Sequence, residues 1–145
     1  MSDTDNGKLC AMTEQKSNKL VGATICTPGT EPDSASEEGR AVRIRELNDR
    51  LRVESQGGII VMTDGIAALG LATVNAIFKA IAGFSAFTAD NDPHGEHDCA
   101  VTEGEGHRII WKIDYYDRSR TCHSPDAADP KVTVRILTVM LASEY

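Results

Sequence analysis

The chain has 145 residues, with 22 acidic against 15 basic side chains and a formal net charge of −7. This length fits one domain with a single buried core. No apolar run reaches the roughly 18 residues that a transmembrane helix needs. The N-terminus lacks the basic and apolar stretch of a secretory signal, so we expect a cytoplasmic protein without membrane contact.

The charge is spread unevenly along the chain. Residues 40–55 carry five arginines against three acids, residues 56–87 are neutral, and residues 88–130 carry ten acids against four bases. General binding to nucleic acid needs clustered lysine and arginine, so an acidic middle argues against it. The same acidity suits docking on a basic groove of another protein, although many cytosolic proteins are acidic for solubility alone.

The first segment of the chain, residues 1–38, is rich in Ser, Thr, Asp, Glu, Gly and Asn and has little hydrophobic periodicity. Segments of this composition bury too little apolar surface to fold on their own. The sequence therefore predicts a flexible leader over residues 1–38 and a single domain over residues 39–145.

Two helices and a short strand are predicted in the first half of the domain. Ser36 followed by two acids is typical of a helix N-terminus, and apolar residues at helical spacing continue the helix to about residue 55. The run Ile59–Thr63 indicates a short buried strand, and residues 71–84 form a second apolar helical pattern. The arginines of the first helix are expected to face solvent or a partner; they are Arg43, Arg45, Arg50 and Arg52.

A β-hairpin is predicted next. The runs Cys99–Glu103 and His107–Tyr116 flank a glycine-containing turn at residues 104–106. Aromatic side chains on a sheet can stack nucleic-acid bases, but their apolar neighbours here indicate core packing. The residues that alternate onto one face of the second run are Ile109, Trp111, Ile113 and Tyr115.

The C-terminal segment is predicted to be a helix. Asp129 and Pro130 have the residue types of an N-cap and a first helical position. The spacing of Val132, Ile136 and Val139 supplies an apolar stripe. The order of elements then predicts an α+β fold, in which about three helices pack on a small antiparallel sheet made of the short strand and the hairpin.

The densest group of polar residues is the stretch NDPHGEHD, residues 91–98. As a calcium loop that begins at Asp90, it lacks the bidentate glutamate of the twelfth position, where Val101 stands. As a transition-metal site it offers imidazoles and carboxylates, but a loop does not hold them in register. The candidate metal ligands are His94, His97, Asp90 and Asp98.

Acid–base catalysis is the second possibility for this stretch. A histidine beside carboxylates can serve as a tuned general base. No nucleophile elbow, phosphate-binding loop or dinucleotide-binding glycine pattern occurs in the chain, so no cofactor is expected and the sequence favours a binding protein over an enzyme. The candidate catalytic residues are His97, Glu96 and Asp114.

Five ordered stretches carry a family resemblance: RIRELNDRLR (43–52), FTADNDPHGEHD (87–98), WKIDYYD (111–117), SPDAADP (124–130) and VTVRILTVMLASEY (132–145). Together they resemble an uncharacterised family of small proteobacterial proteins, a domain of unknown function whose genes recur on plasmids and other mobile elements. The resemblance covers about residues 40–145. It departs at Cys99-Ala100, where the family usually has Phe-Gly, and at Thr121–His123, where an aromatic residue and a glycine are common.

The resemblance implies no catalytic residues, but it implies a context. Small acidic proteins encoded on mobile elements often inhibit host defences, by anti-restriction or anti-CRISPR action. We therefore expect an inhibitor that binds the basic nucleic-acid groove of a host defence complex and does not bind nucleic acid itself. The alternatives are an enzyme centred on NDPHGEHD and a plasmid-associated scaffold or interaction protein. The expected partner-binding residues are Asp90, Asp92, Glu96, Asp98, Asp114 and Asp117.

Overall fold

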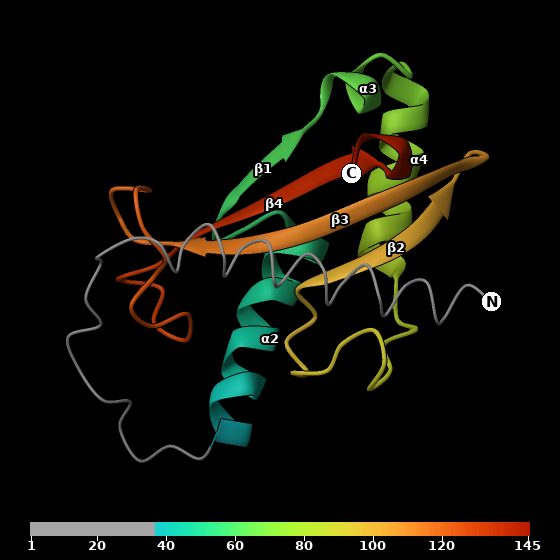
Figure 1. Ribbon diagram of the computed structural model, residues 1–145. Helices are drawn as coiled ribbons and strands as arrows, with labels where there is room; N and C mark the ends of the chain where they lie inside the picture. The colour runs from blue at the N-terminus through green and yellow to red at the C-terminus, as the bar shows by residue number, and fades with distance from the viewer. Residues whose placement is uncertain (1–36) are drawn as a thin grey trace.

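The computed structural model describes residues 37–145 (Figure 1). The leader predicted for residues 1–38 therefore lies, apart from its last two residues, outside the described part of the chain. None of the helices in this part is long and apolar enough to cross a membrane. The elements follow in the order α2 (Glu37–Glu54), β1 (Ile59–Met62), α3 (Asp64–Ala67), α4 (Leu71–Gly83), β2 (Cys99–Gly104), β3 (His107–Tyr116), β4 (Val134–Leu141) and the 3-10 helix η1 (Ala142–Glu144).

The four strands form one mixed sheet in the order β1-β4-β3-β2. Strand β3 pairs antiparallel with both β2 and β4, whereas β1 pairs parallel with β4. Helices α2 and α4 lie on the same side of this sheet (Figure 1). The predicted α+β class is confirmed, but the sheet is not purely antiparallel, because β1 enters it parallel to the C-terminal strand.

The predicted hairpin is confirmed. Strands β2 and β3 are joined by Glu105 and Gly106, whose φ angles of 52° and 80° fit a two-residue turn of type I′. This turn fixes the register, in which Gly104 pairs with His107 and Ala100 with Trp111. Because side chains alternate along a strand, the register also decides which residues of β3 face the helices.

Trp111 lies in the middle of the core and is completely buried. The rings of Phe84 and Phe87 lie nearly perpendicular to it, with ring centroids 6.1 and 6.2 Å away. Such edge-to-face pairs add to the free energy that apolar burial contributes. The other buried residues of this cluster come from the three α-helices and from the sheet, and include Leu51, Ile66, Ile77, Ile81, Ile109, Leu137 and Val139.

The predicted C-terminal helix is wrong, because these residues form strand β4. Their burial alternates from Arg135 through Leu137 to Val139, which is the period of a strand with one face on the core. The apolar residues of this segment fit a helical period as well, so periodicity alone does not decide between the two. The excess of β-branched residues, which prefer strands, is the signal that decides it. Asp129 accepts the Lys131 N–H within a turn instead of capping a helix.

Two details of the first half of the domain also differ from expectation. Strand β1 is not buried, because it is the edge strand of the sheet. The second helix begins after the short helix α3 and Gly70, and its first residue, Leu71, is 77% exposed and does not belong to the core stripe. The expected helix over residues 71–84 is otherwise confirmed.

The C-terminus is tied to the end of β1 by Glu144. Its Oε2 accepts the Thr63 hydroxyl hydrogen and the Leu141 N–H at 2.9 Å, and its Oε1 accepts the Gly65 N–H of α3 at 3.2 Å. The Thr63 bond, followed by the Leu141 bond, lowers the pKa of this carboxyl below its usual value. The ionised form is therefore favoured in the folded protein.

We predict that Glu144→Gln lowers the melting temperature at neutral pH and that this difference disappears in acid. A carboxyl whose pKa is lower in the folded protein stabilises it above the unfolded pKa of about 4.3, and this contribution is lost as the pH falls through the folded pKa. Thermal unfolding of both proteins between pH 7 and pH 3 measures it, with Glu103→Gln on the exposed hairpin as control. A difference that does not change with pH would contradict this role of Glu144.

Candidate functional site

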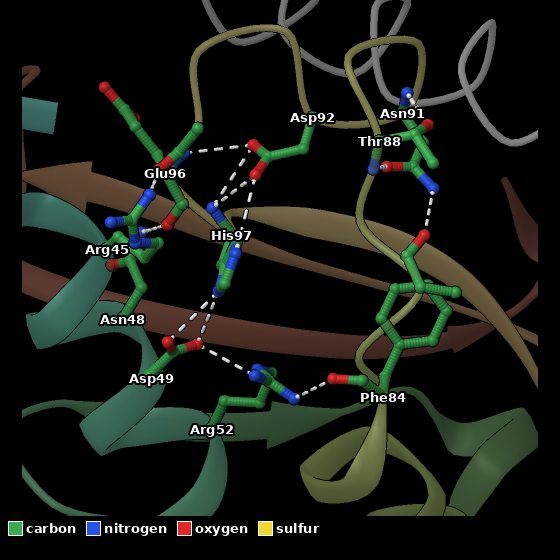
Figure 2. A network of polar contacts seen from close by, with 12 residues as sticks. Arg45, Asn48, Asp49, Arg52, Phe84, Thr88, Asn91, Asp92, Glu96 and His97 are labelled. Atoms are coloured by element: carbon green, nitrogen blue, oxygen red, sulfur yellow. Dashed lines mark hydrogen bonds and ion pairs between the residues drawn. The ribbon is translucent and has the colours of Figure 1, made fainter. Parts of the chain in front are cut away.

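The predicted site lies in the connection between α4 and β2, residues 84–98, which contacts α2 (Figure 2). Asn91 folds the first part of this connection and is buried. Its Oδ1 accepts the Thr88 N–H at 2.7 Å, and its Nδ2 donates to the Ala86 carbonyl at 2.8 Å. An asparagine side chain that replaces backbone partners in this way fixes a turn.

Asp92 organises the second part of the connection. The side chain is buried, and Oδ1 accepts the N–H of Glu96 at 3.0 Å and that of His97 at 3.2 Å. The chain between these groups turns sharply, with Gly95 and His97 at positive φ angles of 67° and 53°. A residue other than glycine rarely adopts this conformation, so the Asp92 carboxylate serves to hold the loop in it.

His97 lies between two carboxylates. Its Nδ1 is 3.0 Å from each carboxylate oxygen of Asp49 on α2, and its Nε2 is 3.8 Å from Oδ2 of Asp92 (Figure 2). The ring stacks on Phe87, with centroids 3.7 Å apart and planes 7° from parallel. A general base needs a ring nitrogen open to the substrate, whereas both nitrogens here face carboxylates. This imidazole fastens the loop to α2.

Asp49 also holds Arg52, which corrects the expectation that the arginines of α2 all face outward. Arg52 is buried, and its Nη2 donates to Oδ1 of Asp49 at 2.8 Å. Its Nη1 lies 2.7 to 3.1 Å from carbonyl oxygens at the C-terminal end of α4, those of Ile81, Ala82 and the C-cap residue Phe84. A guanidinium at this end of a helix satisfies carbonyls that have no partner within the helix.

A second set of contacts begins at Asn48, one residue before Asp49 and completely buried. Its Nδ2 donates to the Glu96 carbonyl at 2.8 Å and to the Tyr115 hydroxyl at 2.7 Å. Its Oδ1 accepts from Nε of Arg135 at 3.0 Å. The Tyr115 hydroxyl in turn donates to Oε2 of Glu96 at 2.9 Å. One amide side chain thus connects α2, the loop, β3 and β4.

Arg135 is 1% exposed and reaches beyond Asn48 to the segment between β3 and β4. Its Nη2 donates to the Ala127 carbonyl, and its guanidinium carbon lies 5.3 Å from the centre of the Tyr115 ring. Burial lowers the pKa of Arg135, because the interior solvates its charge poorly. We call the side chains of Asn48, Glu96, Tyr115 and Arg135 the polar core network.

Tyr115 remains a neutral hydrogen-bond donor in this network. Burial raises the pKa of its hydroxyl well above the usual value, and the negative charges of Asp98 and Glu96 raise it further. The ring of His123 packs edge-on against Tyr115, with centroids 6.3 Å apart, and burial lowers the pKa of that imidazole. Neither of the two groups with a shifted pKa, Tyr115 and His123, lies beside an identified nucleophile.

The predicted catalytic residues do not converge. Glu96 contacts Tyr115 and His97 contacts Asp49, so their functional atoms point to different partners. Asp114 forms an ion pair with Lys112 at 3.0 Å, on the face of β3 opposite to Tyr115. The four candidate metal ligands are also divided, since Asp90 and His94 are exposed while His97 is held by Asp49 and Asp92. Within residues 37–145, no group of three or more His, Cys, Asp or Glu side chains is arranged to hold a metal ion.

The six expected partner-binding acids lie in different settings. Asp92 is buried within its loop, and Oε2 of Glu96 accepts a hydrogen bond from the Tyr115 hydroxyl. Asp90 is exposed, and Asp98 is half-buried near the Tyr115 hydroxyl. Partial desolvation raises the pKa of Asp117, but hydrogen bonds from Ser119, Thr121 and Cys122 outweigh it and hold that pKa below its usual value.

A model of the family described as "Protein of unknown function (DUF3768)" matches residues 62–144. The chain belongs to this family. No curated protein and no solved structure matches the chain. The matched residues contain the loop, the hairpin and β4, whereas α2 lies outside them.

The five stretches on which the resemblance in the sequence was based meet at the polar core network. Each of the five contributes one partner, and these partners are Asn48, Glu96, Tyr115, Ala127 and Arg135. The geometry therefore gives these stretches a shared structural role, which is to satisfy a buried arginine and to hold the loop on α2. Four of these five partners, all except Asn48 on α2, lie inside the residues that match the family.

Sequence reasoning missed Asn48, Asp49 and Arg135. A signal for two of them was present. Asn48 falls on the apolar stripe of α2 between Ile44 and Leu51, and Arg135 alternates with Leu137 on the core face of β4. A polar residue at a position that the pattern assigns to the core must find a partner there.

We predict that Asn48→Ala lowers the free energy of unfolding by about 2–4 kcal/mol, because it leaves Nε of Arg135 and the Glu96 carbonyl buried without their partner. Urea denaturation measures the change. Asn75→Ala, at an exposed position of α4, is the matched control and should change the free energy by less than about 0.5 kcal/mol. A loss for Asn48→Ala no larger than that of the control would show that the network is not required for stability.

Proposed function

We propose that this protein is a non-enzymatic inhibitor, encoded by a mobile element, that binds a nucleic-acid-targeting bacterial defence complex of the CRISPR type. The observation that carries the proposal is that the polar side chains of the loop form hydrogen bonds within the protein. The side chains that resemble catalytic or metal-binding groups contact one another and the backbone. The remaining acids supply negative charge to the surface, and charge is sufficient for docking on a basic groove.

The charge distribution supports this docking. Residues 88–130 carry ten acids against four bases, and only Asp92 among the ten is buried. These acids lie on segments that the sheet and α2 hold in place, so little conformational entropy is lost when they bind. A loop fixed in this way can present carboxylates at set positions to arginine and lysine side chains, as a phosphate backbone does.

Within this proposal, burial and hydrogen bonding distinguish the six candidate contact residues from one another. Asp92 is left out of the proposed contact because its carboxylate holds the loop together, and Glu96 because the Tyr115 hydroxyl donates to its carboxylate. Asp90 and Asp117 are the best placed of the expected set, since Asp90 is exposed and Asp117 is ionised on a solvent-facing turn. Asp98 and Asp114 are partly buried. The contact surface of the proposal is therefore Asp90, Asp98, Asp114 and Asp117.

We predict that expression of the protein restores transformation of a plasmid targeted by a CRISPR system in a host that carries that system. The variant Asp90→Lys/Asp117→Lys should lose this effect, with binding to the purified effector complex weakened about tenfold or more, because two attractive charges become repulsive. Plasmid transformation and a binding titration with the effector complex provide the two measurements. The matched control is Glu54→Lys/Asp64→Lys, which reverses two exposed acids outside residues 88–130.

Each outcome of this experiment bears on the proposal. Thermal unfolding of both double variants separates lost binding from lost structure, and Asp90→Lys alone serves if the Asp117 turn does not tolerate lysine. No recovery of transformation with the unaltered protein against any of the tested CRISPR effectors would overturn the proposal. Equal activity of Asp90→Lys/Asp117→Lys and of the control Glu54→Lys/Asp64→Lys would show that the acids of residues 88–130 do not make the contact.

A further inference from the structure

The exposed apolar side chains of the described residues gather on one strand. Large hydrophobic side chains with substantial exposure are Val53, Ile59, Val61, Met62 and Leu71. Three of these five belong to β1, where they are 37%, 40% and 41% exposed. Single exposed apolar residues are common on protein surfaces, but here Ile59 and Val61 alternate onto one face of the strand and Met62 onto the other, so apolar side chains are exposed on both faces of β1.

Strand β1 is also an edge of the sheet. Its one neighbour among the described strands is β4, and in Figure 1 it forms the side of the sheet opposite to β2. Thr63, which continues β1, donates its N–H to the Val139 carbonyl. Because successive residues of a strand direct their backbone groups to opposite sides, Ile60 and Met62 direct theirs away from β4.

Nothing in the sequence of β1 discourages pairing with another strand. Edge strands are commonly protected by a lysine, a proline or a bulge, whereas β1 reads Ile-Ile-Val-Met. An apolar edge with unpaired backbone groups is a template for one more strand. The surface therefore fits a partner that adds a strand.

The charge of the chain indicates which partner this is. Residues 55–63, which contain β1, have no charged side chain, while the whole chain carries −7; the acids Asp64 and Glu144 lie just beyond the C-terminal end of this strand. A basic partner would be attracted to the acidic segments and not to this edge. A second copy of the same acidic chain, in contrast, can approach closely only where the surface is neutral.

We propose that two copies of this protein form a symmetric dimer in which their β1 strands pair antiparallel. A two-fold axis through Val61 satisfies the outward backbone groups, because Ile60 of one copy then exchanges both hydrogen bonds with Met62 of the other. Val61 faces its own counterpart in a non-hydrogen-bonded pair, where side chains are closest. Asp64 comes opposite Gly58, so the axis brings no two acids face to face.

The interface is small, since each copy contributes a four-residue strand and the apolar side chains beside it. Interfaces of this size belong to the weak class, so the dimer should dissociate on dilution. Its two sheets would join into one continuous eight-stranded sheet, and each β2 would lie at an outer edge. The acidic loop before β2 would therefore remain exposed in both copies.

Sedimentation velocity of the full chain over a range of concentrations tests the dimer. We expect the unaltered protein to shift from monomer to dimer as the concentration rises, and Val61→Lys to weaken association about tenfold or more, because it places two like charges opposite each other at the axis. Asn75→Lys, which adds the same charge at an exposed position of α4, should leave association unchanged. Val61→Lys should still unfold in a cooperative thermal transition, because lysine is common on the edge strands of natural sheets.

A second experiment tests the register in which the two β1 strands pair. A Val61→Cys variant should form a disulfide between the two copies, which mass spectrometry identifies as a link from position 61 to position 61, whereas Asn75→Cys should not form the corresponding link. Amide exchange at Ile60 and Met62 should slow as dimer forms. A monomer at all concentrations would overturn the proposal, and slow exchange at these amides in that monomer would show that another part of the chain covers the edge. A dimer that Val61→Lys leaves intact would equally overturn it.

Discussion

The buried charge of Arg135 is the constraint on which the arrangement of this domain depends. A guanidinium that is 1% exposed costs several kcal/mol unless its donors find partners. One partner is far away in the sequence, since Asn48 is 87 residues distant, and the other, the Ala127 carbonyl, belongs to the loop just before β4. Helix α2, β3 and β4 must therefore come together in one register for the charge to be tolerated. Such a requirement disfavours alternative packings more than it adds to stability.

The same constraint explains the content of NDPHGEHD. The loop that carries it is attached to α2 twice, through the contacts of Glu96 with Asn48 and Tyr115 and through His97 with Asp49. Each attachment uses a residue type that is also common in active sites. What distinguishes the two uses is whether a polar atom is left open for a substrate. Here the carboxylate of Asp92 and both nitrogens of His97 face other protein groups, so the composition of the loop reflects its attachment to the helix.

Local signals in the sequence were sufficient for the hairpin and for helices α2 and α4, because a glycine-containing turn and a helical apolar stripe each specify structure within a few residues. They failed for β4, where Leu137 and Val139 satisfy the period of a strand and Val132 and Ile136 that of a helix. They failed also for the polar core network. An asparagine or arginine is by default a surface residue, and its burial becomes evident only when a partner distant in sequence is known.

The position of charge within the fold links the two proposed surfaces. Strand order β1-β4-β3-β2 places the neutral edge at β1 and the acidic loop before β2, at opposite sides of the sheet. A pair of molecules joined at β1 would leave the two acidic loops before β2 at the outer sides of the joined sheet, far from the two-fold axis. Repulsion between them would then be reduced by distance and by salt screening, which extends over about 8 Å at physiological ionic strength. Self-association and binding to a basic partner are thus compatible in this fold, because the sheet separates the surface that repels a second copy from the edge that can accept one.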